Sequence, residues 1–135
     1  MFVHPDYVLG TLIKGFEFYK NLPPGMARAV FIMFLVAEVH PFVDGNGRIA
    51  RIMMNAELCS AGLSTIIIPT VYREDYLSGL RALSRRERVL PLIKMLSRAQ
   101  SYSTLDFSNY PSALNTITQN QWFLEPDEGV ILGAN

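Results

Sequence analysis

The sequence predicts an all-α domain, and three observations lead to this fold class. Apolar residues recur at helical spacing in several helix-length segments. Proline and glycine separate these segments, and no internal repeat or low-complexity tract interrupts them. Half of the 135 residues are hydrophobic and 18% are charged, which is enough apolar material for one buried core.

The first two predicted helices lie upstream of Pro41. The segment that begins at Pro5 has one apolar face and ends at 21–25, where proline and glycine follow. A second helix runs from about Met26 to Val39 and is apolar nearly all round, as is typical of a central helix. It stops there because the residue before a proline is disfavoured in the helical conformation. The apolar face of the first helix consists of Val8, Leu9, Leu12, Ile13 and Phe16.

A turn-forming segment, Asp44-Gly45-Asn46-Gly47, follows the second helix. Its composition also suits a β-hairpin, but a helical pattern lies on both sides, which favours helix, tight loop, helix. The downstream helix continues until Gly62, which suits the position just after a helix end. Its apolar positions are Ile49, Ile52, Met53, Ala56 and Leu58.

The remaining elements are shorter. The β-branched run 64–69 is predicted to be an extended connector. Further helices are expected at about 74–83, 91–100 and 112–120, and an irregular tail at 124–135.

The charges are balanced overall but segregated along the chain. Twelve Lys and Arg face twelve Asp and Glu, which argues against a whole-molecule electrostatic grip on nucleic acid or on an acidic membrane. Residues 73–98 hold seven basic and three acidic side chains, whereas residues 99–135 hold four acidic side chains and no Lys or Arg. These two segments either pack near one another or face solvent, or the basic one attracts a polyanionic ligand or partner.

The sequence predicts a cytoplasmic protein. Cys59 is the single cysteine, so no internal disulfide can form. The most apolar stretch, 29–37, lies between Arg28 and Glu38 and is too short for a bilayer span of about 20 residues. The N-terminus does not have the basic and apolar pattern of a secretion signal.

The loop and helix start at 40–51 form an anion site on physical grounds. Glycines at 45 and 47 can take positive φ and turn backbone N–H groups toward one point, next to a helix N-terminus. Arg48 and Arg51 are expected on one face of the first turn, where each cation opposes the helix dipole at a cost of about 0.3–1 kcal/mol. A bound phosphate resolves this conflict.

Two further side chains predict chemistry at this anion site. Asp44 supplies a hard oxygen suited to a magnesium ion that bridges phosphates. His40 supplies an imidazole, the side chain suited to acid–base chemistry near neutral pH, which can take a proton from an incoming hydroxyl. Together these features predict phosphoryl or nucleotidyl transfer. The plainer alternatives, a simple turn and a histidine that interacts with a helix dipole, do not explain the two arginines. Phe42 is expected to anchor the loop in the core, and Met33, Met53 and Met54 to fill the core.

The segment HPFVDGNGRIAR, residues 40–51, resembles the signature of the Fic family. It fits the pattern HPFx(D/E)GNGRxxR at all nine specified positions. The likeness covers roughly residues 2–100 and includes Ile68-Pro69 and 73–76. It implies an all-α Fic core at 1–102, followed by a helical extension and irregular tail at 103–135. It also implies transfer of AMP from ATP to a protein hydroxyl.

The resemblance assigns a role to each site residue. His40 would be the base, and Asp44 would hold Mg²⁺ on the phosphates of ATP. The segment Gly45, Asn46 and Gly47 would form the anion hole. The remaining assignments are Arg48 and Arg51 on the phosphates and Tyr76 in the nucleoside pocket.

Departures from the family pattern refine the prediction. Doc-type kinases carry lysine where this chain has Gly47, so adenylylation is favoured. Ser84 stands where several members have asparagine near the adenosine. The family's flap hairpin would lie upstream of Phe2, so it is expected to be absent. The inhibitory helix is not found either, because the Glu128-Gly129 pair is preceded by Leu124 rather than by Ser or Thr.

Three functional alternatives follow from the sequence. The first is a protein adenylyltransferase whose target offers a Tyr, Thr or Ser hydroxyl. The second is an inactive or truncated module that binds nucleotide or phosphate without transfer. The third is the same fold acting on another nucleotide or phospho-donor. An inhibitor acting in trans and a homo-oligomer stay open.

Overall fold

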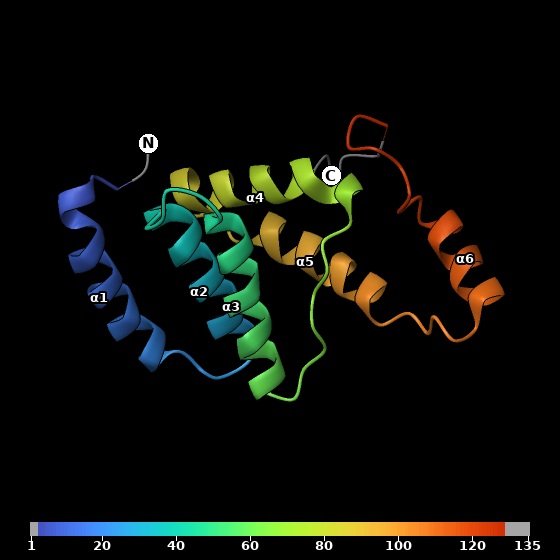
Figure 1. Cartoon of the computed structure of the whole chain (residues 1–135), viewed down its shortest axis with the longest axis horizontal. Coiled ribbons are helices and arrows are strands. Elements are labelled where there is room, and N and C mark those ends of the chain that lie inside the picture. Colours follow the sequence, from blue (N-terminus) through green and yellow to red (C-terminus); the bar gives the residue numbers. More distant parts are fainter. Residues whose placement is uncertain (1–2, 129–135) are drawn as a thin grey trace. The chain divides into compact units, whose positions relative to one another are not determined.

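The structure is a computed structural model that describes residues 3–128. Within this range the regular secondary structure is helical and includes no strand, which confirms the all-α prediction (Figure 1). The chain divides into two compact units, Met1–Leu63 and Ser64–Asn135. The predicted domain boundary at residue 102 and the predicted absence of the flap stay predictions.

Three helices form the first unit, and all three match the sequence prediction closely. α1 spans Pro5–Asn21, α2 spans Met26–Val39 and α3 spans Asn46–Ser60. The side chain of His4 caps α1 by accepting a hydrogen bond from the Asp6 N–H. α2 packs against α3 on one side and against α1 on another (Figure 1).

The core of this unit is centred on α2. Ile32, Leu35 and Val39 are buried there, and partly buried residues of α1 and α3 pack against them. α1 approaches α2 closely at Gly15, where an added Cβ would lie 2.5 Å from the Leu35 methyl carbons. The three predicted core methionines fit this picture, because Met33 and Met54 are fully buried and Met53 is partly buried.

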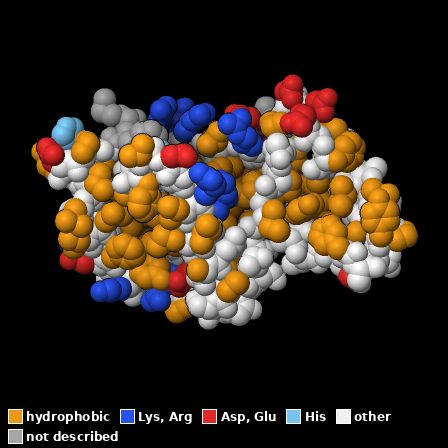
Figure 2. Space-filling view, in the orientation of Figure 1, with side chains coloured by type: hydrophobic (Ala, Val, Ile, Leu, Met, Phe, Trp, Pro, Cys, Tyr) orange, Lys and Arg blue, Asp and Glu red, His pale blue; other side chains and the backbone are white. Residues whose placement is uncertain are grey.

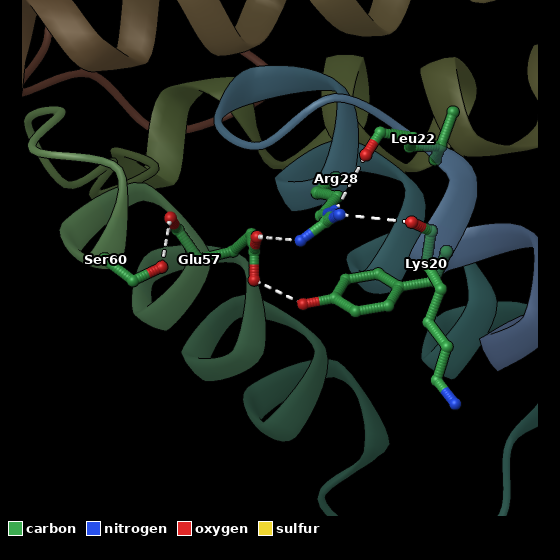
Figure 3. A network of polar contacts seen from close by, with 6 residues as sticks. Lys20, Leu22, Arg28, Glu57 and Ser60 are labelled. Atoms are coloured by element: carbon green, nitrogen blue, oxygen red, sulfur yellow. Dashed lines mark hydrogen bonds and ion pairs between the residues drawn. The ribbon is translucent and has the colours of Figure 1, made fainter.

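A polar network joins the three helices near the C-terminal end of α3, at the end away from the α2–α3 connection. Glu57 accepts a hydrogen bond of 2.5 Å from the Tyr19 hydroxyl and lies 3.9 Å from Arg28 Nη1. Arg28 also donates to the carbonyl oxygens of Leu22 and Lys20, at 2.9 and 3.2 Å (Figure 3). The Arg28 guanidinium lies 5.1 Å from the centre of the Tyr19 ring. The network therefore fixes the α1–α2 connection onto α3.

Tyr19→Phe is expected to lower the stability of the protein. It should also make this stability change less as the pH rises above about 10. The hydrogen bond to Glu57 raises the pKa of Tyr19 above 10.0. A raised pKa stabilises the folded state below about pH 10, and this contribution is lost as the pH rises through the folded-state pKa. Loss of a hydrogen bond to a charged group predicts about 1.5–3 kcal/mol at neutral pH.

Urea unfolding followed by circular dichroism at pH 8 and above pH 10 measures both effects. Tyr7→Phe is the matched control, because Tyr7 is exposed on the same helix. Equal alkaline dependence in the parent and Tyr19→Phe would contradict the assignment.

Between residues 64 and 128, the second unit contains one short 3₁₀ helix and three α-helices. The 3₁₀ helix η1 (Thr70–Tyr72) leads directly into α4 (Arg73–Arg86), and α5 spans Leu90–Ser103. α6 spans Tyr110–Gln119. α4 and α5 are longer than predicted, and η1 was not predicted, because the β-branched sequence around it favours extended backbone.

Close helix packing and a buried tryptophan help to hold the second unit together. α4 and α5 meet at Gly79, where an added Cβ would lie 3.1 Å from the Leu92 Cα. Trp122 is buried, donates its indole N–H to the Tyr72 hydroxyl at 2.5 Å, and packs its ring edge-on against Tyr102. The predicted irregular tail has a bend at residue 124 and turns at 126–128, and its remainder lies outside the described residues. Across the described chain, every helix is too short or too polar to cross a bilayer.

Candidate active site between α2 and α3

A pocket of about 270 Å³ lies where α2 ends and α3 begins. It is built within the first unit and brings together seven of the eight predicted site residues. Tyr76, the eighth, lies in α4 of the second unit, where its side chain is buried, and its role stays a prediction. The lining residues are His40, Val43, Asp44, Gly45, Asn46, Gly47, Arg48 and Arg51.

His40 takes a left-handed backbone conformation at the end of α2. Its φ and ψ are both 54°, and its N–H donates to the Val36 carbonyl oxygen at 3.1 Å. Nδ1 lies 3.1 Å from the Ala37 carbonyl oxygen. Because a carbonyl oxygen only accepts, Nδ1 carries the proton in this contact, and the neutral ring has its basic lone pair on Nε2. The backbone turn and this hydrogen bond together orient the imidazole.

Gly45 supplies the positive φ that the sequence predicted, and Gly47 does not. Gly45 has φ 80° and precedes the first residue of α3, whereas Gly47 lies inside the first helical turn. The first backbone hydrogen bond of α3 runs from Ile49 N–H to the Gly45 carbonyl, and no side chain caps the helix. The N–H groups of residues 46–48 therefore precede this ladder, which creates a site for an anion.

The side chain of Asn46 fastens the loop rather than facing a ligand. It is buried, its Oδ1 accepts from the Phe42 N–H at 2.9 Å, and its Nδ2 donates to the Phe42 carbonyl oxygen at 2.7 Å. Asn46 can therefore serve an anion hole through its backbone N–H. The prediction that Phe42 anchors the loop in the core is wrong, because half of its surface is exposed. The loop is held at the Phe42 backbone instead.

Asn46→Ala is expected to loosen the loop. It would deprive the Phe42 N–H and carbonyl oxygen of their partners, at about 1–3 kcal/mol for each unsatisfied group that water does not reach. The measurement is amide hydrogen exchange, with faster exchange expected at Phe42. Asn21→Ala is the control, because Asn21 makes only an exposed bond to the Glu17 carbonyl. Unchanged exchange at Phe42 would show that the amide contact does not hold the loop.

The charged residues of the pocket divide into a pair and a single arginine. Arg48 Nη2 lies 3.2 Å from Asp44 Oδ2, and both side chains are largely exposed. Arg51 forms no hydrogen bond or ion pair with any residue in 3–128 and is half-buried. Arg48 lies in the first turn as predicted, but Arg51 comes three residues later and belongs to the second turn, because α3 begins at Asn46. Its guanidinium reaches back, with Nη1 3.5 Å from the position of a Cβ on Gly47.

Comparisons with known proteins find the family that residues 40–51 resemble. Residues 1–58 match the model of the Fic/DOC family. Protein adenylyltransferase fic-1 of Caenorhabditis elegans is 28% identical over 123 residues, which cover 87% of this chain and 23% of that protein. Protein adenylyltransferase Fic of Drosophila mojavensis is 31% identical, and the match covers 84% of this chain and 24% of that protein. The chain thus spans about a quarter of the length of these curated relatives. Over its first 58 residues, the chain is therefore similar to the Fic/DOC family.

Proposed function

We propose that this chain transfers AMP from ATP to a hydroxyl group of a target protein. The observation that carries the proposal is the pocket between α2 and α3, which places an imidazole beside a helix N-terminus and two arginines. The printed names of the relatives, protein adenylyltransferases, support the same reaction. Tyr, Thr and Ser hydroxyls are the proposed acceptors, and Tyr76 is proposed to contact the nucleoside.

The phosphates of ATP are bound by backbone and side-chain donors of α3. The N–H groups at residues 46–48 and the dipole of α3 attract negative charge. Arg51 adds a guanidinium that the described part of the protein does not neutralise. Gly47 leaves this surface free of a side chain. The fold itself does not require glycine at this position, because an added Cβ would make only ordinary contact with Arg51.

The residues present fit a magnesium ion bound together with ATP. Asp44 offers an exposed carboxylate at the pocket, and within residues 3–128 no three His, Cys, Asp or Glu side chains gather to hold a metal by themselves. Magnesium is commonly held by one or two carboxylates, with phosphate oxygens and waters as its other ligands. Such an ion would supply neutralisation of charge on the phosphates.

In the transfer step the target hydroxyl oxygen forms a bond to the α-phosphorus of ATP. The bond between this phosphorus and the oxygen that leads to the β-phosphate breaks, and pyrophosphate leaves. The hydroxyl proton passes to Nε2 of His40, whose orientation is fixed by the Nδ1 contact with the Ala37 carbonyl. The guanidinium groups stabilise the charge that develops on the leaving group.

Parallel incubations with ATP labelled at the α-phosphate and at the γ-phosphate test the proposal. We expect labelled protein with the α-label only, together with one pyrophosphate released for each AMP transferred. Label from the γ-phosphate would identify a kinase instead. Calorimetric binding of magnesium–ATP with no labelled protein would favour the alternative of a nucleotide-binding module.

A further inference from the structure

A second pocket lies on α4, in the other compact unit, and most of its lining is arginine. Its volume is about 250 Å³, and all of its residues come from one face of α4, at helical spacings of three and four. Figure 2 shows Lys and Arg side chains gathered in the part of the view where Figure 1 labels α4. The lining residues are Ser78, Arg81, Ala82, Arg85 and Arg86.

The three arginines are not neutralised by the rest of the described chain. None of them forms an ion pair within residues 3–128, whereas the neighbouring Arg73 pairs with Glu74 at 3.6 Å. Glu87, the next carboxylate, follows the helix in a left-handed conformation and does not line the pocket.

The end of a helix explains part of this cluster but not all of it. Arg85 and Arg86 lie in the last turn of α4, where cations interact favourably with the helix dipole. Arg81 lies a turn earlier and faces Arg85 at a spacing of four residues, and like charges at this spacing destabilise a helix. A bound anion would remove this repulsion.

We propose that the α4 pocket binds a polyphosphate-type anion. Guanidinium groups form paired hydrogen bonds with phosphate oxygens, and three of them line a single compact pocket. Ser78 adds a hydroxyl that donates to the Asp75 carbonyl oxygen at 3.1 Å and can rotate toward a ligand. A compact group of high charge fits this arrangement better than an extended acidic peptide, whose carboxylates are spread along a chain. The site lies within the second unit and does not depend on the proposed transferase activity.

Pyrophosphate is the probe, and the full chain is titrated with it by calorimetry and by NMR of the arginine Nε–H groups. We expect the signals of Arg81, Arg85 and Arg86 to shift, and pyrophosphate to bind more tightly than inorganic phosphate or sulfate. Arg85→Glu should weaken this binding by about tenfold or more, because an attractive charge becomes repulsive. Arg85→Gln preserves good helix propensity and should show a smaller loss in the same direction.

Two control variants separate this site from the pocket between α2 and α3. Arg98→Glu makes the same charge change on an exposed part of α5 and should leave pyrophosphate binding unchanged. Arg51→Glu should remove binding at the first pocket while the α4 signals still shift, so failure of one site is distinguished from failure of the other.

Two results would overturn the proposal. One is an equal weakening of pyrophosphate binding by Arg85→Glu and Arg98→Glu, which would indicate an effect of net charge rather than a specific site. The other is binding that appears only after Glu125, Asp127 and Glu128 are changed to glutamine. In that case the chain's own acidic segment, rather than a bound anion, would neutralise the α4 arginines.

Discussion

Arg51→Glu is expected to abolish the binding of magnesium–ATP while the protein stays folded. Arg51 lines the pocket, and no carboxylate in the described part of the chain pairs with it. Reversing its charge replaces an attraction to the phosphates by a repulsion. One hydrogen bond to a charged group is worth about 1.5–3 kcal/mol, so its loss alone should lower affinity by about 10- to 100-fold, and the new repulsion should lower it further.

The same substitution should leave stability unchanged or slightly higher. An acidic residue near the start of α3 interacts favourably with the helix dipole, at about 0.3–1 kcal/mol in the first turn and less beyond it. Titration calorimetry measures the affinity, and urea unfolding by circular dichroism measures stability. Arg98→Glu is the charge-matched control. A large loss of stability would show that Arg51 supports the fold, and unchanged affinity would exclude it from the phosphate site.

His40→Asn is expected to stop AMP transfer while preserving ATP binding. Asparagine tolerates the left-handed backbone that residue 40 adopts, whereas alanine there would add strain. Its amide cannot take the hydroxyl proton at neutral pH. Because a positioned general base contributes about 10²- to 10⁴-fold, transfer should fall by that factor while ATP affinity stays near that of the parent.

The other histidine supplies the matched control. His4 caps α1 and does not line the pocket, and asparagine is itself a favourable cap, so His4→Asn should keep full activity. The rate of α-labelled AMP incorporation compares the two variants. A parent-like rate in His40→Asn would remove His40 from the mechanism, and a parallel loss of ATP affinity would assign it to binding instead.

The helices of the first unit were predictable because local physics defines their ends. Pro5 and the cap before it start α1, Pro41 prevents α2 from continuing past His40, and Gly62 ends α3 with φ 70°. The second unit was less predictable. Its helices are longer than their apolar periodicity indicated, because residues at their ends are polar and carry little pattern.

At the site, the sequence predicted which residues gather but not what each contacts. The Asp44-Gly45-Asn46-Gly47 turn and the following arginines lie at one pocket because they are close in the chain. The contact of Asn46 with the Phe42 backbone was missed. The available signal was an asparagine between two glycines. Its burial could not be read from the sequence, because burial depends on how α2 and α3 pack.

By itself, the sequence determined the all-α class, the ends of the first three helices and the composition of the loop at 40–51. These features depend on interactions between residues a few positions apart, which a linear pattern records. Tertiary structure alone decided that Glu57 joins Tyr19 and Arg28, that Phe42 is exposed and that the α4 arginines line a pocket. Those outcomes depend on which surfaces the packed helices bury and which they leave to solvent, and no short stretch of sequence specifies that choice.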